Sequence, residues 1–178
     1  MEISSTDQVE KLYEESADSY ATMMDSEIGL PLYASVLGRL QKKLATVSGM
    51  LIDTSCGSGH MLSMYREKFE NKRSLLGIDL SPSMVRIAQD RLGASADIHV
   101  GDMRKLAMVE DDSAAAVISF FALHHLGPDD VQRALGEWRR VLVKGGQLLV
   151  AAWEGAGTID YGDASDVVAL RYREAELS

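Results

Sequence analysis

Short apolar runs alternate with amphipathic segments from Gly49 onward, and this alternation constrains the fold more than any other feature of the chain. The runs read as strands buried on both faces, because apolar residues follow one another without a polar residue at every second position. They cover residues 50–53, 74–79, 97–100, 114–121 and 147–153. The segments between them predict helices over 60–69, from Ser81-Pro82 to about Leu92, and from Pro128 to Leu142. This order predicts an α/β fold with a doubly wound, mostly parallel sheet.

The part of the chain before this alternation has a helical pattern. Val9, Leu12, Tyr13 and Ala17 recur at helical spacing, and Pro31 ends the run. A second amphipathic segment follows, with leucine or valine at positions 32, 36, 37, 40 and 44. We therefore expect residues 1–45 to form a helical lid and residues 46–178 to form the ligand-binding domain of a single globular unit.

Composition limits the partners and the compartment. The 178 residues correspond to about one domain, with a net charge of −9 and no basic stripe. Nucleic acids and anionic membranes are bound through lysine and arginine, so neither partner is expected. No apolar run approaches the roughly 18 residues of a membrane span, and the polar, acidic start does not resemble a signal peptide. The single cysteine, Cys56, excludes an internal disulfide and a thiol-rich metal site. We expect a cytoplasmic protein that holds no metal.

A glycine turn follows the first predicted strand, at the edge of the sheet where ligands bind in folds of this class. Gly57 and Gly59 match the first two positions of the dinucleotide fingerprint G-x-G-x-x-G, but the third position is Leu62. Asp53, just before the turn, would repel a pyrophosphate and attract a positively charged group. The turn therefore favours a cationic ligand over a dinucleotide.

A second acid completes this prediction. Asp79 ends the second strand, 20 residues after Gly59, where a carboxylate accepts hydrogen bonds from ribose hydroxyls. A ligand with a ribose and a positive charge but no phosphate satisfies both acids. S-adenosylmethionine has these properties.

The ordered motifs resemble those of class I S-adenosylmethionine-dependent methyltransferases of the small-molecule type, over roughly residues 13–153. DTSCGSG resembles the family's first motif, D-x-G-x-G-x-G. The later motifs are matched by GIDLSPSMVRIAQ, VGDM, ISFFALHHL and WRRVLVKGGQLLVAAW. The resemblance implies a Rossmann-like domain that binds S-adenosyl-L-methionine, releases S-adenosyl-L-homocysteine and methylates an O, N or C nucleophile of a small molecule.

The resemblance also implies which residues bind the cofactor. The methionine end would lie between Asp53 and Gly57, in the turn that also holds Ser55, Cys56 and Gly59. Ser55 replaces the family's first glycine, and a positive φ there would cost a serine energy, so we expect slightly altered binding. The other implied contacts are Asp79 to the ribose, Leu80 and Met84 to the adenosine, Asp102 and Met103 to the adenine, Phe120 near the methyl group, and Tyr20 closing over the cofactor.

Two neighbouring histidines follow the fourth strand, at the mouth where a methyl acceptor would lie. An O or N acceptor loses a proton, so His124 or His125 is a candidate catalytic base. The alternative is that they pack against or cap the helix that begins at Pro128. The Met23-Met24 pair and the region of Tyr33 are assigned to the lid or the core rather than to a binding site.

The chain ends early relative to the family pattern. After the fifth strand the family has a helix and an antiparallel strand pair; residues 162–178 predict the start of that helix, and the last two strands are missing. An open sheet edge would need a cover, such as a homodimer partner, unless the chain is a shortened form of a longer protein, which we favour. Two functional alternatives stay open: a non-catalytic S-adenosylmethionine-binding module, and a nicotinamide-dependent oxidoreductase, which Leu62 and Asp53 disfavour.

Overall fold

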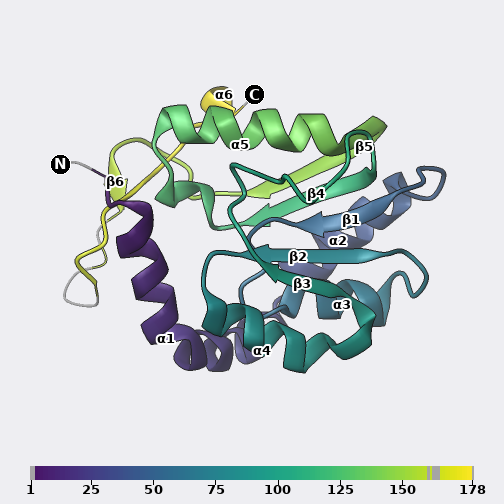
Figure 1. The fold of residues 1–178 in the computed structure, drawn as a ribbon, viewed down its shortest axis with the longest axis horizontal. Helices are drawn as coiled ribbons and strands as arrows, with labels where there is room; N and C mark the ends of the chain where they lie inside the picture. The colour runs from purple at the N-terminus through teal and green to yellow at the C-terminus, as the bar shows by residue number, and fades with distance from the viewer. Residues whose placement is uncertain (1–2, 160, 162–164, 178) are drawn as a thin grey trace.

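The protein is built on a five-stranded parallel sheet. A computed structural model describes residues 3–159, 161 and 165–177 (Figure 1). The strand order is β3-β2-β1-β4-β5, and every neighbouring pair is parallel. The first strand, β1, lies in the middle of the sheet; β2 and β3 follow on one side of it, and β4 and β5 on the other. The strand order therefore reverses between β1 and β4, which is where ligands bind in folds of this kind. The strands are β1 (Met50–Asp53), β2 (Leu75–Asp79), β3 (Asp97–Val100), β4 (Ala114–Phe120) and β5 (Leu142–Ala151).

Helices cover both faces of the sheet, which confirms the predicted doubly wound α/β fold. One face packs against α2 (Pro31–Lys43), α3 (His60–Lys68) and α4 (Pro82–Leu92), and the other against α5 (Pro128–Val141). Leu51 belongs to the first core and Ile52 to the second, because successive side chains of a strand point to opposite faces.

Helix α1 (Thr6–Glu27) is placed differently. It lies across the end of the sheet to which the strand arrowheads point (Figure 1). A capping box starts it: Ser5 Oγ accepts from the Gln8 N–H at 3.3 Å, and Gln8 Oε1 accepts from the Ser5 N–H at 2.9 Å. The predicted cap of α4 is also present, with Ser81 Oγ accepting from the Met84 N–H at 3.2 Å.

Strand β5 departs from its predicted bounds. It begins at Leu142, directly after α5, rather than at residue 147, and it ends at Ala151. Ala114 pairs with Leu142 and Ala116 pairs with Gln147, so a bulge containing Gly145 and Gly146 interrupts the pairing. The two glycines thus lie inside the strand, and Trp153 lies beyond its end.

The prediction that a helix starts within residues 162–178 is wrong for most of the described residues of this segment. Ala169–Leu170 form a short strand, β7, antiparallel to β6 (Thr158–Ile159), and only α6 (Glu174–Leu177) is helical. The segment is held by tertiary contacts: the Val168 N–H donates to Ser4 Oγ at 2.8 Å, and Tyr172 is buried in the α5-side core and bonds to the Leu126 carbonyl. Residues 162–164 and 178 lie outside the described part.

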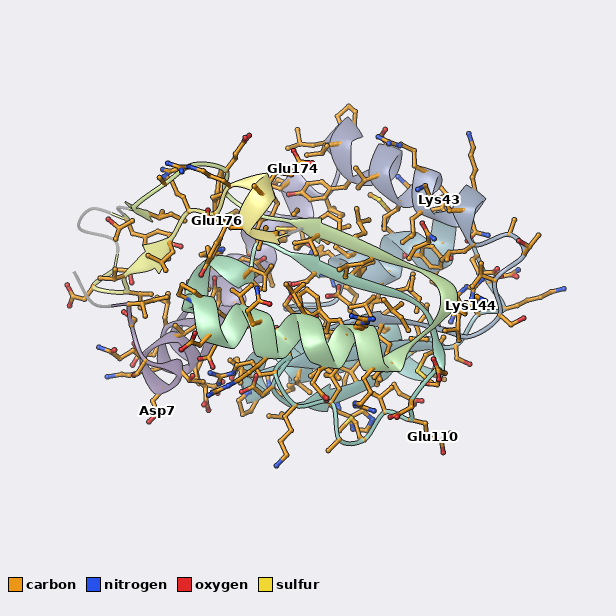
Figure 2. The ribbon with its side chains drawn as sticks, turned by 90° about the horizontal axis from the view of Figure 1, so that it is seen from above. Asp7, Lys43, Glu110, Lys144, Glu174 and Glu176 are labelled. Carbon is orange, nitrogen blue, oxygen red and sulfur yellow. The ribbon has the colours of Figure 1, made fainter. Side chains whose placement is uncertain are left out.

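The outer surface is charged. Figure 2 shows the labelled side chains of Asp7, Lys43, Glu110, Lys144, Glu174 and Glu176 around the periphery of the molecule. Within the described ranges, no helix combines the length and apolar character needed to cross a membrane. The remaining described elements are two short 3-10 helices, η1 (Gly93–Ser95) and η2 (Leu123–His125).

Candidate functional site

Two adjoining chambers lie between α1 and the carboxyl ends of the strands. The first chamber, of about 80 Å³, is lined by residues that include Asp79, Leu80, Met84, Asp102, Met103 and His125. The second, of about 410 Å³, is lined by residues that include Met23, Tyr33, Asp53, Cys56, His124 and Trp153. Tyr13, Tyr20, Ser55, Phe120 and Phe121 line both and form their common border. Gly57 also lines the first chamber.

Asp79 joins the end of β2 to the glycine turn. Its Oδ2 accepts a hydrogen bond from the Gly57 N–H at 2.8 Å, and its Oδ1 accepts from the Ser81 N–H at 3.0 Å. Burial raises the pKa of Asp79, although these bonds to the backbone oppose the shift. The carboxylate is therefore oriented by the backbone and faces the first chamber.

Asp53 is a buried carboxyl with one bond in the described structure, from the Ser55 N–H to Oδ1 at 3.2 Å. Burial raises its pKa to about 7, and the charge of Asp79 adds to the shift. Among the described residues that line the two chambers, none is lysine or arginine. The two acids thus form a negative site that a positively charged ligand would neutralise.

Within the glycine turn, only glycines have a positive φ. Gly57 and Gly59 have φ values of 49° and 82°, whereas Ser55 is not among the described residues with positive φ. The predicted conformational cost at Ser55 is therefore wrong, because the turn does not need the left-handed region there. Instead, Ser55 Oγ lies 3.0 Å from Ser119 Oγ and links the ends of β1 and β4.

Gly59 and Cys56 do not have the same role as their neighbours in the turn. Gly59 lines neither chamber; an added Cβ would lie 3.0 Å from the Leu92 side chain and 3.1 Å from Ala88, so a glycine here lets α3 approach α4. Cys56 lines the second chamber, but burial raises the pKa of its thiol, so it is not an activated nucleophile.

Asp102 is paired with an arginine that the sequence did not single out. Its Oδ1 accepts from the Arg104 backbone N–H at 2.8 Å, and its Oδ2 accepts from the guanidinium at 2.5 Å. Burial works to raise the pKa of Asp102, but the bonds to Arg104 outweigh it and the pKa is lowered. Arg104 also donates to Asp130 at 2.6 Å and to Thr6 of α1 at 2.9 Å. Nothing in the spacing of the sequence marks Arg104.

The two histidines are buried, and each lines one chamber: His125 the first and His124 the second. Their ring centroids are 4.0 Å apart, and His125 Nε2 lies 2.8 Å from the Tyr13 hydroxyl. Burial lowers the pKa of His124 to about 3 and that of His125 to about 4, so both are neutral at pH 7. Helix α5 has no side-chain cap, so the capping alternative is wrong. Neutral imidazoles can accept or donate hydrogen bonds here, but they are weak bases.

Aromatic rings form the wall beyond β4 and β5. Phe120 lies 6.2 Å from Tyr33, and Phe121 lies 5.1 Å from Trp153, both between ring centroids. Phe121 has a φ of 51°, an uncommon conformation for a bulky residue that is often found at functional sites. Tyr33 is in the core, as predicted, but it also lines the second chamber together with Met23 and Met24.

Polar contacts hold α1 over both chambers, and sequence reasoning missed them. The Glu14 carboxylate accepts hydrogen bonds from Ser81 Oγ at 2.8 Å and from Ser83 Oγ at 2.6 Å, at the start of α4. Near the other end, Asp25 accepts from Arg91 at 2.9 Å and pairs with His60 at 2.7 Å. Burial lowers the pKa of His60. These contacts join residues 35 to 69 positions apart, which no local pattern reports.

The comparisons with known proteins agree with this fold and site. A family model described as a methyltransferase domain matches residues 51–146, more than half of the chain. The chain belongs to this methyltransferase-domain family and has the Rossmann-like class I fold.

Three similar proteins illustrate the family. The chain is 29% identical over 103 residues to a dTDP-4-amino-2,3,4,6-tetradeoxy-D-glucose N,N-dimethyltransferase of Saccharopolyspora spinosa, covering 58% of the chain and 40% of that protein. It is 32% identical over 114 residues to a malonyl-[acyl-carrier protein] O-methyltransferase of Serratia marcescens, covering 64% and 42%. The chain spans about two fifths of the length of these relatives. The crystal structure of Streptomyces venezuelae DesVI aligns over 99% of this chain and 88% of its own, with a TM-score of 0.65 at 19% identity.

Proposed function

We propose that the protein binds S-adenosyl-L-methionine at the border of the two chambers and transfers its methyl group to an O, N or C nucleophile of a small molecule in the second chamber. The observation that carries this proposal is the pair of acids around the glycine turn, buried Asp53 and partly buried Asp79, with no lysine or arginine among the described lining residues. Membership of the methyltransferase-domain family supports it. Residues 1–45 would serve as the lid and residues 46–178 as the cofactor-binding domain.

The lining residues fit the parts of this cofactor. Asp53 would hold the positively charged methionine end, beside Ser55, Cys56 and Gly57. Asp79, oriented by two backbone bonds, would accept from the ribose hydroxyls. The apolar side chains of Leu80, Met84 and Met103 would enclose the adenosine, next to Asp102, and Tyr20 and Phe120 would flank the methyl group at the common border.

The protein's own residues would act mainly through position. When bound, the cofactor supplies an electrophilic methyl group and leaves as S-adenosyl-L-homocysteine. The aromatic walls and α1 hold the acceptor in line with that group and exclude water, and alignment alone provides a large part of the rate. His124 would accept a hydrogen bond from the acceptor; its low pKa makes it an orienting group rather than a strong base.

Calorimetry with S-adenosyl-L-homocysteine tests the cofactor assignment, and nicotinamide adenine dinucleotide is the matched competitor. We expect binding of the first and none of the second. Binding of the dinucleotide alone would overturn the proposal in favour of an oxidoreductase. Methyl transfer to a panel of small metabolites then separates an enzyme from a non-catalytic binding module, which would bind the cofactor and methylate nothing.

A further inference from the structure

The second chamber has aromatic walls on the side away from the glycine turn. Phe120, Phe121 and Trp153 form a continuous series with centroid distances of 6.5 and 5.1 Å, and Tyr33 packs on Phe120 at 6.2 Å. The volume of about 410 Å³ lies within the range of small-molecule pockets, roughly 300–1,000 Å³. Aromatic faces carry negative charge density and attract cations as well as apolar groups.

The charge around the chambers is also negative beyond what the cofactor would balance. Five acids line them: Glu10, Asp79 and Asp102 in the first, and Glu27 and Asp53 in the second. Arg104 pairs with Asp102, and Asp53 is only about half ionised at neutral pH because its pKa is about 7. The other three acids are Glu10, Glu27 and Asp79. S-adenosyl-L-methionine carries a sulfonium, an ammonium and a carboxylate, hence one net positive charge. A surplus of negative charge therefore remains when the cofactor is bound.

Among these acids, Glu27 is the one placed to attract a positively charged acceptor. It is the last residue of α1, it is exposed, and it lines the second chamber together with Asp53. Its carboxylate is close enough to Tyr33 to raise the pKa of that hydroxyl, although burial contributes more. Glu27 would repel an anionic acceptor, and it would attract a cationic acceptor more strongly than a neutral one, which could offer it only a hydrogen bond.

His124 also borders the second chamber, with a neutral ring. His124 is 3% exposed, lines the second chamber, and its Nδ1 has no hydrogen-bond partner in the described structure. That nitrogen has almost no accessible surface, so it does not face the chamber, and any contact with a ligand is made by the rest of the ring. Because the ring is neutral, it can accept a hydrogen bond from an N–H group.

From the aromatic wall and the surplus negative charge, we propose that the second chamber selects amine acceptors, which enter as ammonium ions with an attached apolar or aromatic group, and that methylation occurs on nitrogen. This inference rests on the proposed methyltransferase function. The ammonium gives a proton to water at the open mouth; the nitrogen lone pair then forms the new N–C bond while the methyl–sulfur bond breaks and its electron pair stays on sulfur. Glu27 and the rings bind the cation, and His124 orients the remaining N–H.

The test measures affinities for phenethylamine and 2-phenylethanol in the presence of saturating S-adenosyl-L-homocysteine. The two probes have nearly the same shape, but only the amine is charged at neutral pH. We expect the amine to bind at least about tenfold more tightly. Glu27→Gln should weaken the binding of phenethylamine by about three- to tenfold and leave the binding of 2-phenylethanol unchanged. Trp153→Leu should also reduce the affinity for the amine more than the affinity for the alcohol. Asp18→Asn, an exposed change on the same helix outside both chambers, is the control and should alter neither.

The outcomes separate this inference from the function on which it rests. If S-adenosyl-L-homocysteine binds but the alcohol binds as tightly as the amine, amine selection is overturned and the methyltransferase proposal stands. Equal losses of affinity for both probes in Glu27→Gln would also overturn amine selection, because they would indicate a structural effect of the substitution. If S-adenosyl-L-homocysteine does not bind, both proposals fall.

Discussion

The carboxyl edge of the sheet has two unlike halves. Strands β1, β2 and β3 lead into acids, namely Asp53, Asp79 and, just past β3, Asp102. Strands β4 and β5 lead into the aromatic residues Phe120, Phe121 and Trp153. The acids are held by backbone or arginine bonds, whereas the aromatic residues contact one another through ring packing.

This difference teaches how one sheet can combine a constant task with a variable one. Directional hydrogen bonds suit a ligand with fixed polar groups, and the motifs DTSCGSG, GIDLSPSMVRIAQ and VGDM all lie in the acidic half. Ring surfaces tolerate ligands of different shapes, so the aromatic half is suited to the acceptor under the proposed function. Helix α1 contacts both halves and joins them through Tyr13, which reaches His125.

The largest effect is expected in the acidic half. Asp79→Ala removes the carboxylate that accepts from Gly57 and Ser81 and faces the first chamber. We expect affinity for S-adenosyl-L-homocysteine to fall at least about tenfold, or about 1.4 kcal/mol, measured by calorimetry. Asp97→Ala, an exposed change at the opposite end of β3, is the control and should bind normally. Unchanged affinity in Asp79→Ala would place the ribose elsewhere.

The next effect concerns pH and Asp53. Because burial raises its pKa to about 7, the free carboxyl is mostly protonated below that pH and ionised above it. S-adenosyl-L-homocysteine has no sulfonium, but the ammonium of its methionine end needs the ionised carboxylate, so its affinity should rise about tenfold from about pH 6 to about pH 8. Calorimetry across this range checks it, and Asp53→Asn should bind weakly with little dependence on pH.

The raised pKa of Asp53 also determines how the free energy of unfolding of the ligand-free protein changes with pH. Between about pH 4 and its folded pKa of about 7, the folded state holds a proton that the unfolded state has lost. The free energy of unfolding should therefore decrease as the pH rises through this window, and Asp53→Asn should flatten that part of the curve. A denaturant titration that shows the opposite slope difference between the two proteins contradicts the assignment.

A smaller effect is expected where α1 joins the halves. Tyr13→Phe removes the hydroxyl that lies 2.8 Å from His125 Nε2 and leaves the ring in place. We expect a loss of about 1 kcal/mol in the free energy of unfolding, the usual value of one such bond. Tyr161→Phe, at another lining tyrosine with no hydrogen bond in the described structure, is the matched comparison and should lose less. Equal losses would show that the bond contributes nothing.

The smallest effect is expected at Ser55, on the border between the halves. Ser55→Gly restores the glycine of the family motif but removes the hydroxyl 3.0 Å from Ser119 Oγ. Because Ser55 does not have positive φ, glycine brings no conformational relief, and cofactor affinity should change by less than about threefold. Ser119→Ala removes the same contact without altering the backbone of the turn. A large gain in affinity for Ser55→Gly alone would show that the serine backbone is strained after all.

Much of the fold was predictable, because each sheet element carries a local signal. Apolar runs marked the five strands, and Ser81-Pro82 marked the start of α4. The segment from 165 to 177 was not predictable as helix or strand, since its conformation follows from contacts with Ser4 and Leu126, both far away in the sequence.

The candidate site divides in the same way. Asp53, Asp79 and Asp102 could be singled out because each lies at or just after the end of a strand, and parallel strands bring those ends together. Arg104, the Tyr13–His125 contact and the aromatic series that includes Phe121 and Trp153 could not, because their importance depends on which distant residues they meet.

The sequence by itself determined the alternation of elements, the glycine turn and the acids at the strand ends, because these depend on local periodicity and on chain order. Only the tertiary structure decided that Ser55 avoids the left-handed region, that the two histidines are neutral, and that α1 lies over two adjoining chambers, both lined by acids and aromatic rings. The physical reason is that burial, pairing and pKa depend on neighbours in space, and α1 reaches those neighbours across the whole sheet.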